Sequence, residues 1–227
     1  MTQFLADTPF LADTQFLPDS SPAAPRYHPA IETLAEYAAG QLRAGFDVVM
    51  AAHLRGCALC RDEVAQFEAL GGGLLDSIEP ACLDDGALAV AMARLDEPAP
   101  TDTGPLSRSL DQLLAGGRRR WIAPGIWIAP IDTPHEPETR VFLLRVGAGS
   151  ATAHHRHSGV EMTQVLVGAL NDNGVIYHAG DMVELDQRHA HHPQVAGNEP
   201  CICLFATHGR LKPTTLLGRL AFALAGV

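Results

Sequence analysis

The stretch GSATAHHRHSGVEMTQVLVG, residues 149–168, holds the densest group of metal-binding side chains in this chain of 227 residues. His155 and His157 lie two residues apart, so on a β-strand both imidazoles project from the same face. By the same alternation, His154 points to the opposite face. Seven of the eleven histidines fall between positions 154 and 192, and imidazole is a common metal ligand. The sequence therefore predicts a metal site on a strand in this region.

The residues around this stretch are typical of a small antiparallel β-structure. After about Trp121, short apolar or β-branched runs alternate with Gly and Asn. The clearest runs are VFLLRV at 141–146, TQVLV at 163–167, MVEL at 182–185 and CICLF at 201–205. Short runs of this kind, separated by turn residues, favour a barrel or jelly roll. We therefore predict that residues 119–227 form an all-β module.

The opening stretch also resembles the first sequence motif of the cupin family at every position. The matching residues are Gly149, His155, His157, Glu161 and Gly168. A second cupin motif follows from Gly180 to His191. It departs from the family at three positions, because Asp186 and Arg188 stand where cupins usually have Pro and Gly, and Val195 stands where Asn is frequent. The resemblance implies a cupin β-barrel with one metal ion, held by His155, His157, Glu161 and His191.

Some alternatives stay open in this module. His192 is adjacent to His191, but strand alternation lets only one of the two face inward. Three imidazoles and a carboxylate suit several metals, and we expect zinc, with iron, manganese or nickel as alternatives. Cys201 and Cys203 also alternate on one face, either as apolar packing or as a redox-sensitive pair with a low thiol pKa.

The first half of the chain has the apolar spacing of helices. Residues from Ile31 to Leu42 follow the i, i+3, i+4 pattern and predict a helix of about 12 residues. A second helical stretch runs from about Asp47 to Leu70, and the glycines at 71–73 are expected to end it. A third covers about 84–95. We predict a helical domain at 26–95.

The flanking segments have a different composition. Residues 1–25 contain a six-residue repeat with prolines and a Ser/Pro/Ala run, which predicts a flexible tail. Residues 96–118 contain three prolines and a short leucine pattern at 106–114, which predicts a linker with one short helix. The expected architecture is therefore α+β in two modules, with an all-α domain followed by the β-barrel.

A second group of metal-binding side chains lies in the helical half, in the sequence HLRGCALC at 53–60. On a continuous helix, His53, Cys57 and Cys60 all point one way. If Gly56 breaks the helix, a Cys-x-x-Cys turn still brings both sulfurs to one ion. Thiolate and imidazole match the preference of zinc for four ligands of this type. His28 is the only other histidine of this half, and we expect it to be the fourth ligand.

These residues resemble the zinc-binding anti-sigma domain, as do YHP at 27–29 and LAEYAAG at 34–40. Followed by a cupin, residues 26–212 resemble the ChrR-type anti-sigma factors. The resemblance implies a transcription regulator that is not an enzyme, whose helical domain binds an extracytoplasmic-function sigma factor. It also implies an oxidative stress response, in which the metal-binding cupin is needed to release sigma upon singlet oxygen or organic hydroperoxide. We expect the sigma-binding surface on the first helix and around 88–95.

Charge and hydropathy limit the other function classes. Sixteen Lys and Arg against 26 Asp and Glu give a net charge of −10, which disfavours direct binding to nucleic acid or to anionic membranes. No apolar run approaches the ~20 residues of a membrane span, and no signal-peptide pattern opens the chain. A cytoplasmic location is therefore expected. The alternative function is a metal-dependent cupin enzyme, such as a dioxygenase or isomerase, which would need a substrate pocket with further acid or base groups.

Overall fold

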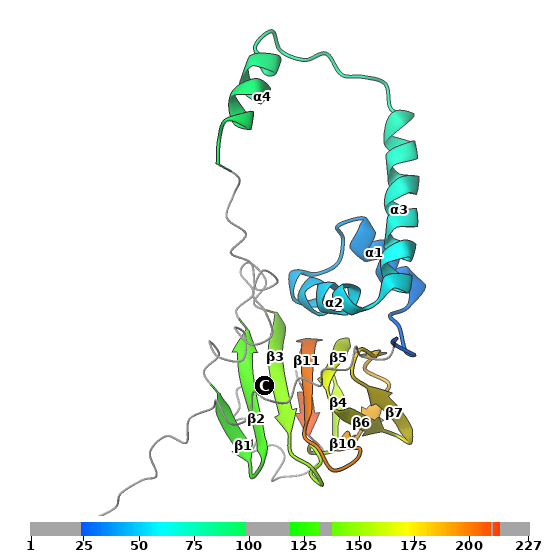
Figure 1. The fold of residues 1–227 in the computed structure, drawn as a ribbon, viewed down its shortest axis with the longest axis vertical. Coiled ribbons are helices and arrows are strands. Elements are labelled where there is room, and N and C mark those ends of the chain that lie inside the picture. The colour runs from blue at the N-terminus through cyan, green and yellow to red at the C-terminus, as the bar shows by residue number, and fades with distance from the viewer. Residues whose placement is uncertain (1–23, 99–118, 132–137, 210, 214–227) are drawn as a thin grey trace, which may run out of the picture.

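The computed structural model describes residues 24–98, 119–131, 138–209 and 211–213 (Figure 1). Most of the 1–25 tail and of the 96–118 linker, including the expected helix at 106–114, lies outside these residues. Within them, helices precede a region of strands, which confirms the predicted α+β class. The helices are α1 (Ile31–Ala38), α2 (Ala44–Gly56), α3 (Ala58–Asp76) and α4 (Ala87–Leu95). The strands are β1 (Arg120–Ala123), β2 (Ile126–Ile131), β3 (Thr139–Val146), β4 (His155–His157), β5 (Glu161–Val167), β6 (Ala169–Asp172), β7 (Val175–His178), β8 (Met182–Leu185), β9 (Ala190–His191), β10 (Gln194–Val195), β11 (Cys201–His208) and β12 (Leu211–Pro213).

The described strands form three antiparallel sheets. The largest has the order β1-β2-β3-β11-β5-β8, and the two smaller ones have the orders β10-β6-β7 and β12-β4-β9. β11 is the centre of the large sheet, since it pairs with β3 on one side and with β5 on the other. Backbone hydrogen bonding therefore divides the expected barrel into three sheets and leaves it without one closed ring of strands.

The boundaries predicted for the first two helical stretches are wrong. Cys57 has an extended backbone (φ −114°, ψ 104°) and divides the expected 47–70 helix into α2 and α3. The glycines at 71–73 lie inside α3, because glycine ends a helix when it takes a positive φ and none of these three does. α1 has eight residues instead of about 12, since Gly40, which follows the C-cap Ala39, adopts a φ of 65°.

One helix, α2, covers one face of the large sheet. α2 packs across β3, β11 and β5 (Figure 1). Its side chains Phe46, Val49 and Met50 are at most 4% exposed and share one core with sheet residues such as Leu143 and Leu204. The opposite face has its own cluster of Ile128, Phe142 and Phe205. One core therefore joins the helical half to the strands.

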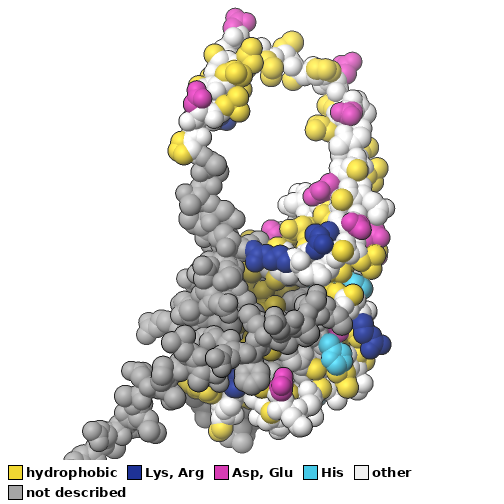
Figure 2. Space-filling model, in the orientation of Figure 1, with side chains coloured by type: hydrophobic (Ala, Val, Ile, Leu, Met, Phe, Trp, Pro, Cys, Tyr) yellow, Lys and Arg dark blue, Asp and Glu magenta, His cyan; other side chains and the backbone are white. Residues whose placement is uncertain are grey.

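The last helix contributes nothing to this core. α4 stands apart from the sheets in Figure 1, and none of its residues is buried. Large apolar side chains, each more than half exposed, extend from the last turns of α3 through the following loop to α4. Figure 2 shows apolar side chains gathered along these segments. They are Leu70, Leu74, Leu75, Ile78, Leu83, Leu88, Val90, Met92 and Leu95, and we call them the distal apolar surface. Among the described helices, none combines the length and apolar character that crossing a bilayer requires.

Candidate metal centres

The structure brings the four predicted metal ligands of the helical half together, and we call this group the helical centre. His53 lies in the last turn of α2, and Cys57 and Cys60 follow at the corner where α3 begins. His28 reaches the same point from the segment before α1. Its Nδ1 lies 3.4 Å from Cys57 Sγ and 3.3 Å from Cys60 Sγ. The break at Cys57 is therefore what folds both sulfurs onto one point.

The chemistry of this donor set fits a zinc ion. His53 Nε2 lies 3.3 Å from Cys60 Sγ, and the four donor atoms all lie within 4.8 Å of one another. Bonds of ~2.0 to 2.3 Å at tetrahedral angles separate neighbouring N and S ligands by about 3.5 Å. Burial, followed by the neighbouring Cys57 thiol, raises the pKa of Cys60 to about 12. A thiolate at this position therefore requires a cation beside it.

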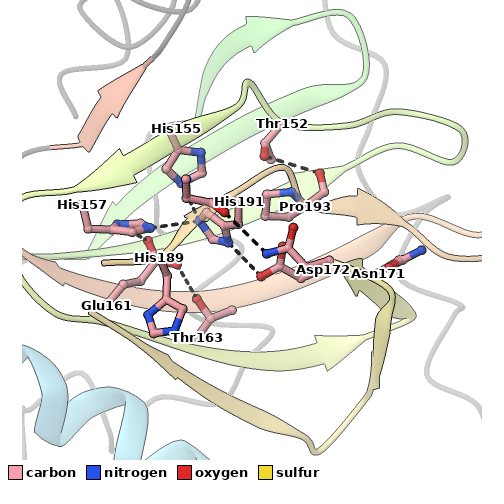
Figure 3. A network of polar contacts seen from close by, with 12 residues as sticks. Thr152, His155, His157, Glu161, Thr163, Asn171, Asp172, His189, His191 and Pro193 are labelled. Carbon is pink, nitrogen blue, oxygen red and sulfur yellow. Dashed lines mark hydrogen bonds and ion pairs between the residues drawn. The ribbon is translucent and has the colours of Figure 1, made fainter. Parts of the chain in front are cut away.

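The second group, which we call the strand centre, comes from separate β-strands. His155 and His157 lie on β4, Glu161 begins β5 and His191 ends β9. All four are at most 6% exposed. His154 and His192 are exposed, as strand alternation requires. The donor atoms of His155, His157, Glu161 and His191 lie within 4.8 Å of one another, and Figure 3 shows the three imidazoles pointing toward a common centre.

The imidazole hydrogen bonds orient the rings of this centre in a way that suits a bound cation. His155 Nδ1 donates to the Ala153 carbonyl at 2.7 Å, and His191 Nδ1 donates to Asp172 Oδ2 at 2.8 Å. The neutral rings therefore direct their Nε2 lone pairs inward, where His191 Nε2 is 2.9 Å from Nε2 of both His155 and His157. A proton on His191 could bridge only one of these two contacts. A metal ion satisfies all three rings.

The pKa shifts follow from burial. Desolvation lowers the pKa of His155 to about 4 and that of His157 to about 3, and nearby imidazoles add to both shifts. Burial also raises the pKa of Glu161 to about 7. Burial disfavours charged His191 as well, but its hydrogen bond to Asp172 and the charge of Glu161 raise its pKa overall. Neutral imidazoles at His155 and His157 are the form that binds metal.

Asp172 is a candidate functional residue that the sequence motifs do not indicate. It is buried at the end of β6 and orients His191 from behind (Figure 3). A carboxylate behind a metal-binding histidine fixes the ring and raises its basicity. No motif spacing points to Asp172, since it is 19 residues from His191 and meets it only through the fold.

Cys201 and Cys203 lie on β11 with their sulfurs 3.6 Å apart. Both are buried in an apolar cluster with Val165 and Leu170. The hydrogen bond between the two thiols, followed by burial, raises the pKa of Cys203 well above its usual value. A reactive pair would need the opposite shift, so this environment favours the packing alternative.

Comparison with known proteins gives matches to both halves of the chain. Residues 117–212 match the ChrR cupin-like domain family. Over 205 residues the chain is 35% identical to the anti-sigma-E factor ChrR of Cereibacter sphaeroides, covering 86% of this chain and 95% of that protein. A crystal structure of Rhodobacter sphaeroides SigE in complex with the anti-sigma ChrR contains a chain with 37% identity and a TM-score of 0.72. That match covers 80% of this chain and 98% of the other.

Proposed function

Since this chain belongs to the ChrR family of anti-sigma factors, we propose that it binds an extracytoplasmic-function sigma factor and keeps it from RNA polymerase. The observation that carries the proposal is the 35% identity over 86% of the chain, because it extends through both the helices and the strands. The related chain in the solved complex is bound to SigE. The role is regulation instead of catalysis, and its place is the cytoplasm, where a sigma factor meets RNA polymerase.

The sigma factor docks on the distal apolar surface. An amphipathic helix whose apolar side chains have no partner within its own chain gains free energy by covering them with another protein. On α4 these side chains include Leu88, Met92 and Leu95, which are 56% to 75% exposed. The first helix takes a smaller part than the sequence suggests, since Leu34 is buried and only Ile31 is a large exposed apolar residue there.

Each centre holds one metal ion. Zinc occupies the helical centre through His28, His53, Cys57 and Cys60, where it fastens the segment before α1 to the α2–α3 corner. A metal ion, zinc first and iron, manganese or nickel as alternatives, occupies the strand centre through His155, His157, Glu161 and His191. The support for both assignments is that the donor atoms of each group converge on one buried point.

Co-purification with the sigma factor tests the proposal. The wild-type chain is coexpressed with an extracytoplasmic-function sigma factor, and zinc content and inhibition of a sigma-dependent reporter are measured. Cys57→Ser with Cys60→Ser should lose the helical zinc and with it sigma binding, because structural zinc contributes on the order of 10 kcal/mol to folding. Cys82→Ser is the matched control, since Cys82 is exposed and outside both centres. Unchanged inhibition by a metal-free double variant would refute the dependence of sigma binding on the helical zinc, and a double variant that keeps its zinc would refute the ligand assignment.

We also propose that the strand centre senses the oxidant that releases sigma. His155→Ala and Glu161→Ala should each leave basal inhibition intact, because the helical centre is separate, and should weaken induction by singlet oxygen or an organic hydroperoxide. The comparison variant is His154→Ala, which changes an exposed imidazole outside the metal group. Normal induction of the His155 and Glu161 variants by both oxidants would show that the cupin has no sensing role.

A further inference from the structure

The helical centre touches the cupin strands directly through His53. Its Nδ1 lies 2.9 Å from Gln164 Oε1 and 3.1 Å from the Gly180 carbonyl, so residues 111 and 127 positions away surround this ring nitrogen. Gln164 Nε2 donates to the Val165 carbonyl at 3.1 Å, which leaves only Oε1 to face His53. Both groups facing Nδ1 are therefore acceptors. Nδ1 must carry the proton, and the lone pair of Nε2 faces Cys60 and the metal position.

His28 is held by the same part of the cupin, on both sides of the ligand. Before it, the backbone N–H groups of Arg26 and Tyr27 donate to Asp181 Oδ1 at 2.6 and 3.1 Å. The backbone carbonyl of Tyr27 also accepts a hydrogen bond from the Met182 N–H at 3.1 Å. After His28, Glu184 accepts from the Ala30 N–H at 3.2 Å and from the Thr33 hydroxyl at 3.0 Å. The polar contacts that fix the backbone around His28 thus come from residues 181–184.

The backbone around the two cysteines is held differently, by hydrogen bonds within the α2–α3 corner. Cys57 N donates to the His53 carbonyl at 3.0 Å, and Cys60 N donates to Cys57 Sγ at 3.4 Å. Arg61 N donates to the Cys57 carbonyl at 3.2 Å. All of these partners belong to the α2–α3 corner. The imidazole ligands and the thiolate ligands of one centre are therefore held by different parts of the chain.

We infer that the cupin provides the outer shell of the helical metal centre, with Gln164 as the positioning residue of His53 and the 180–184 segment as the anchor of His28. The inference rests on the zinc site of the proposed function. It states that β5, a strand of the cupin half, helps the helical centre to retain its metal ion. Gln164 lies three residues after Glu161 on β5 and points to the opposite face. One strand therefore carries a ligand of the strand centre and a support of the helical centre.

Cobalt substitution of the full-length protein tests this inference, because the sulfur-to-cobalt absorption band reports only on a thiolate-ligated site. Gln164→Leu removes the hydrogen-bond acceptor of His53 Nδ1. We expect a chelator to remove cobalt from this variant about 10 to 100 times faster than from the wild-type protein. Gln164→Glu keeps an acceptor and should stay close to the wild-type rate. Met162→Leu is the packing control, since Met162 is a buried neighbour on the same face of β5.

The outcomes separate the inference from the function on which it rests. A wild-type protein without the sulfur-to-cobalt band would refute the zinc site and the positioning role together. A normal band with an unchanged release rate in Gln164→Leu would refute the positioning role alone. Equal losses in Gln164→Leu, Gln164→Glu and Met162→Leu would also refute it, by assigning the effect to packing. Gln164→Asn withdraws the carbonyl without adding an apolar group and repeats the test should Gln164→Leu not fold.

Discussion

At the scale of single residues, groups behind the proposed metal ligands should decide how well each centre holds an ion, and Asp172 is the clearest case. Asp172→Asn removes the carboxylate charge from His191 Nδ1, 2.8 Å away, without changing the side-chain volume much. We expect the metal affinity of the strand centre to fall by a factor of about 10 to 100. Chelator competition measures this, and metal at the helical centre should be unaffected. Asp186→Asn is the control, because that carboxylate pairs with Arg188 outside the centre. Wild-type affinity in the Asp172 variant would contradict the prediction.

Glu184 predicts a dependence of stability on pH. Burial raises its pKa above the ordinary 4.5, although the hydrogen bonds from Thr33 and Ala30 oppose the shift. A carboxyl group whose pKa is higher in the folded state stabilises the fold most below its unfolded pKa. That contribution is lost as the pH rises through the folded pKa. Glu184→Gln does not titrate there, so its melting temperature relative to wild type should increase as the pH rises from 4.5. A difference that stays constant with pH would contradict this.

At the level of single elements, α3 contains a run of glycines where the sequence predicts its end. A Cβ added at Gly71, Gly72 or Gly73 would have nothing within 4 Å. Replacing each by Ala should therefore stabilise the helix by about 1 kcal/mol per site, because glycine loses more backbone entropy. Amide hydrogen exchange along residues 66–76 measures the effect as slower exchange. Gly40→Ala should instead destabilise the protein, since Gly40 has a φ of 65°. Faster exchange in the Gly71–Gly73 variants would show that the run serves another structural purpose.

The contact between α2 and β3 requires a glycine at position 45, because there is no space for a side chain there. A Cβ at Gly45 would collide with Cγ2 of Thr139 and lie 3.2 Å from Val141 Cγ2. Gly45→Ala should lower the free energy of unfolding by about 1 to 3 kcal/mol through overpacking. The midpoint of urea unfolding measures the loss. Gly56→Ala changes a glycine near the other end of α2 that has nothing within 4 Å, so its midpoint should change little. Equal midpoints for the two variants would mean that α2 does not press against β3.

For the whole molecule, the shared core determines what a truncated chain can do. A fragment ending at residue 98 keeps the distal apolar surface, so we expect it to bind the sigma factor. It loses the sheet that covers Phe46, Val49 and Met50, and we expect a lower melting temperature and a tendency to aggregate. Circular dichroism melts and co-purification of the fragment with sigma measure both properties. A fragment as stable as the full chain would show that the sheet adds nothing to the helical half.

The sequence by itself determined what depends on short spacings. The two-residue spacing of His155 and His157 places both imidazoles on the inner face of the strand. The spacing of His53, Cys57 and Cys60 brings three donor atoms to one corner. These features are predictable because the residues in each group are at most seven positions apart. β-strand alternation and the reach of a Cys-x-x-Cys turn constrain them locally. The division into a helical half followed by strands also follows from local periodicity.

Only the tertiary structure decided which groups stand behind the ligands and where the helices lie. Gln164 meets His53 across 111 residues, and Asp172 meets His191 from another sheet. The packing of α2 on the sheet and the exposure of α4 likewise depend on which apolar faces find a partner. Sequence spacing does not predict such contacts. A glutamine on a strand, or the apolar face of a helix, has the same sequence pattern whichever partner it packs against. The placement of Glu161 and Gln164 of β5 beside two different centres is therefore a property of the fold.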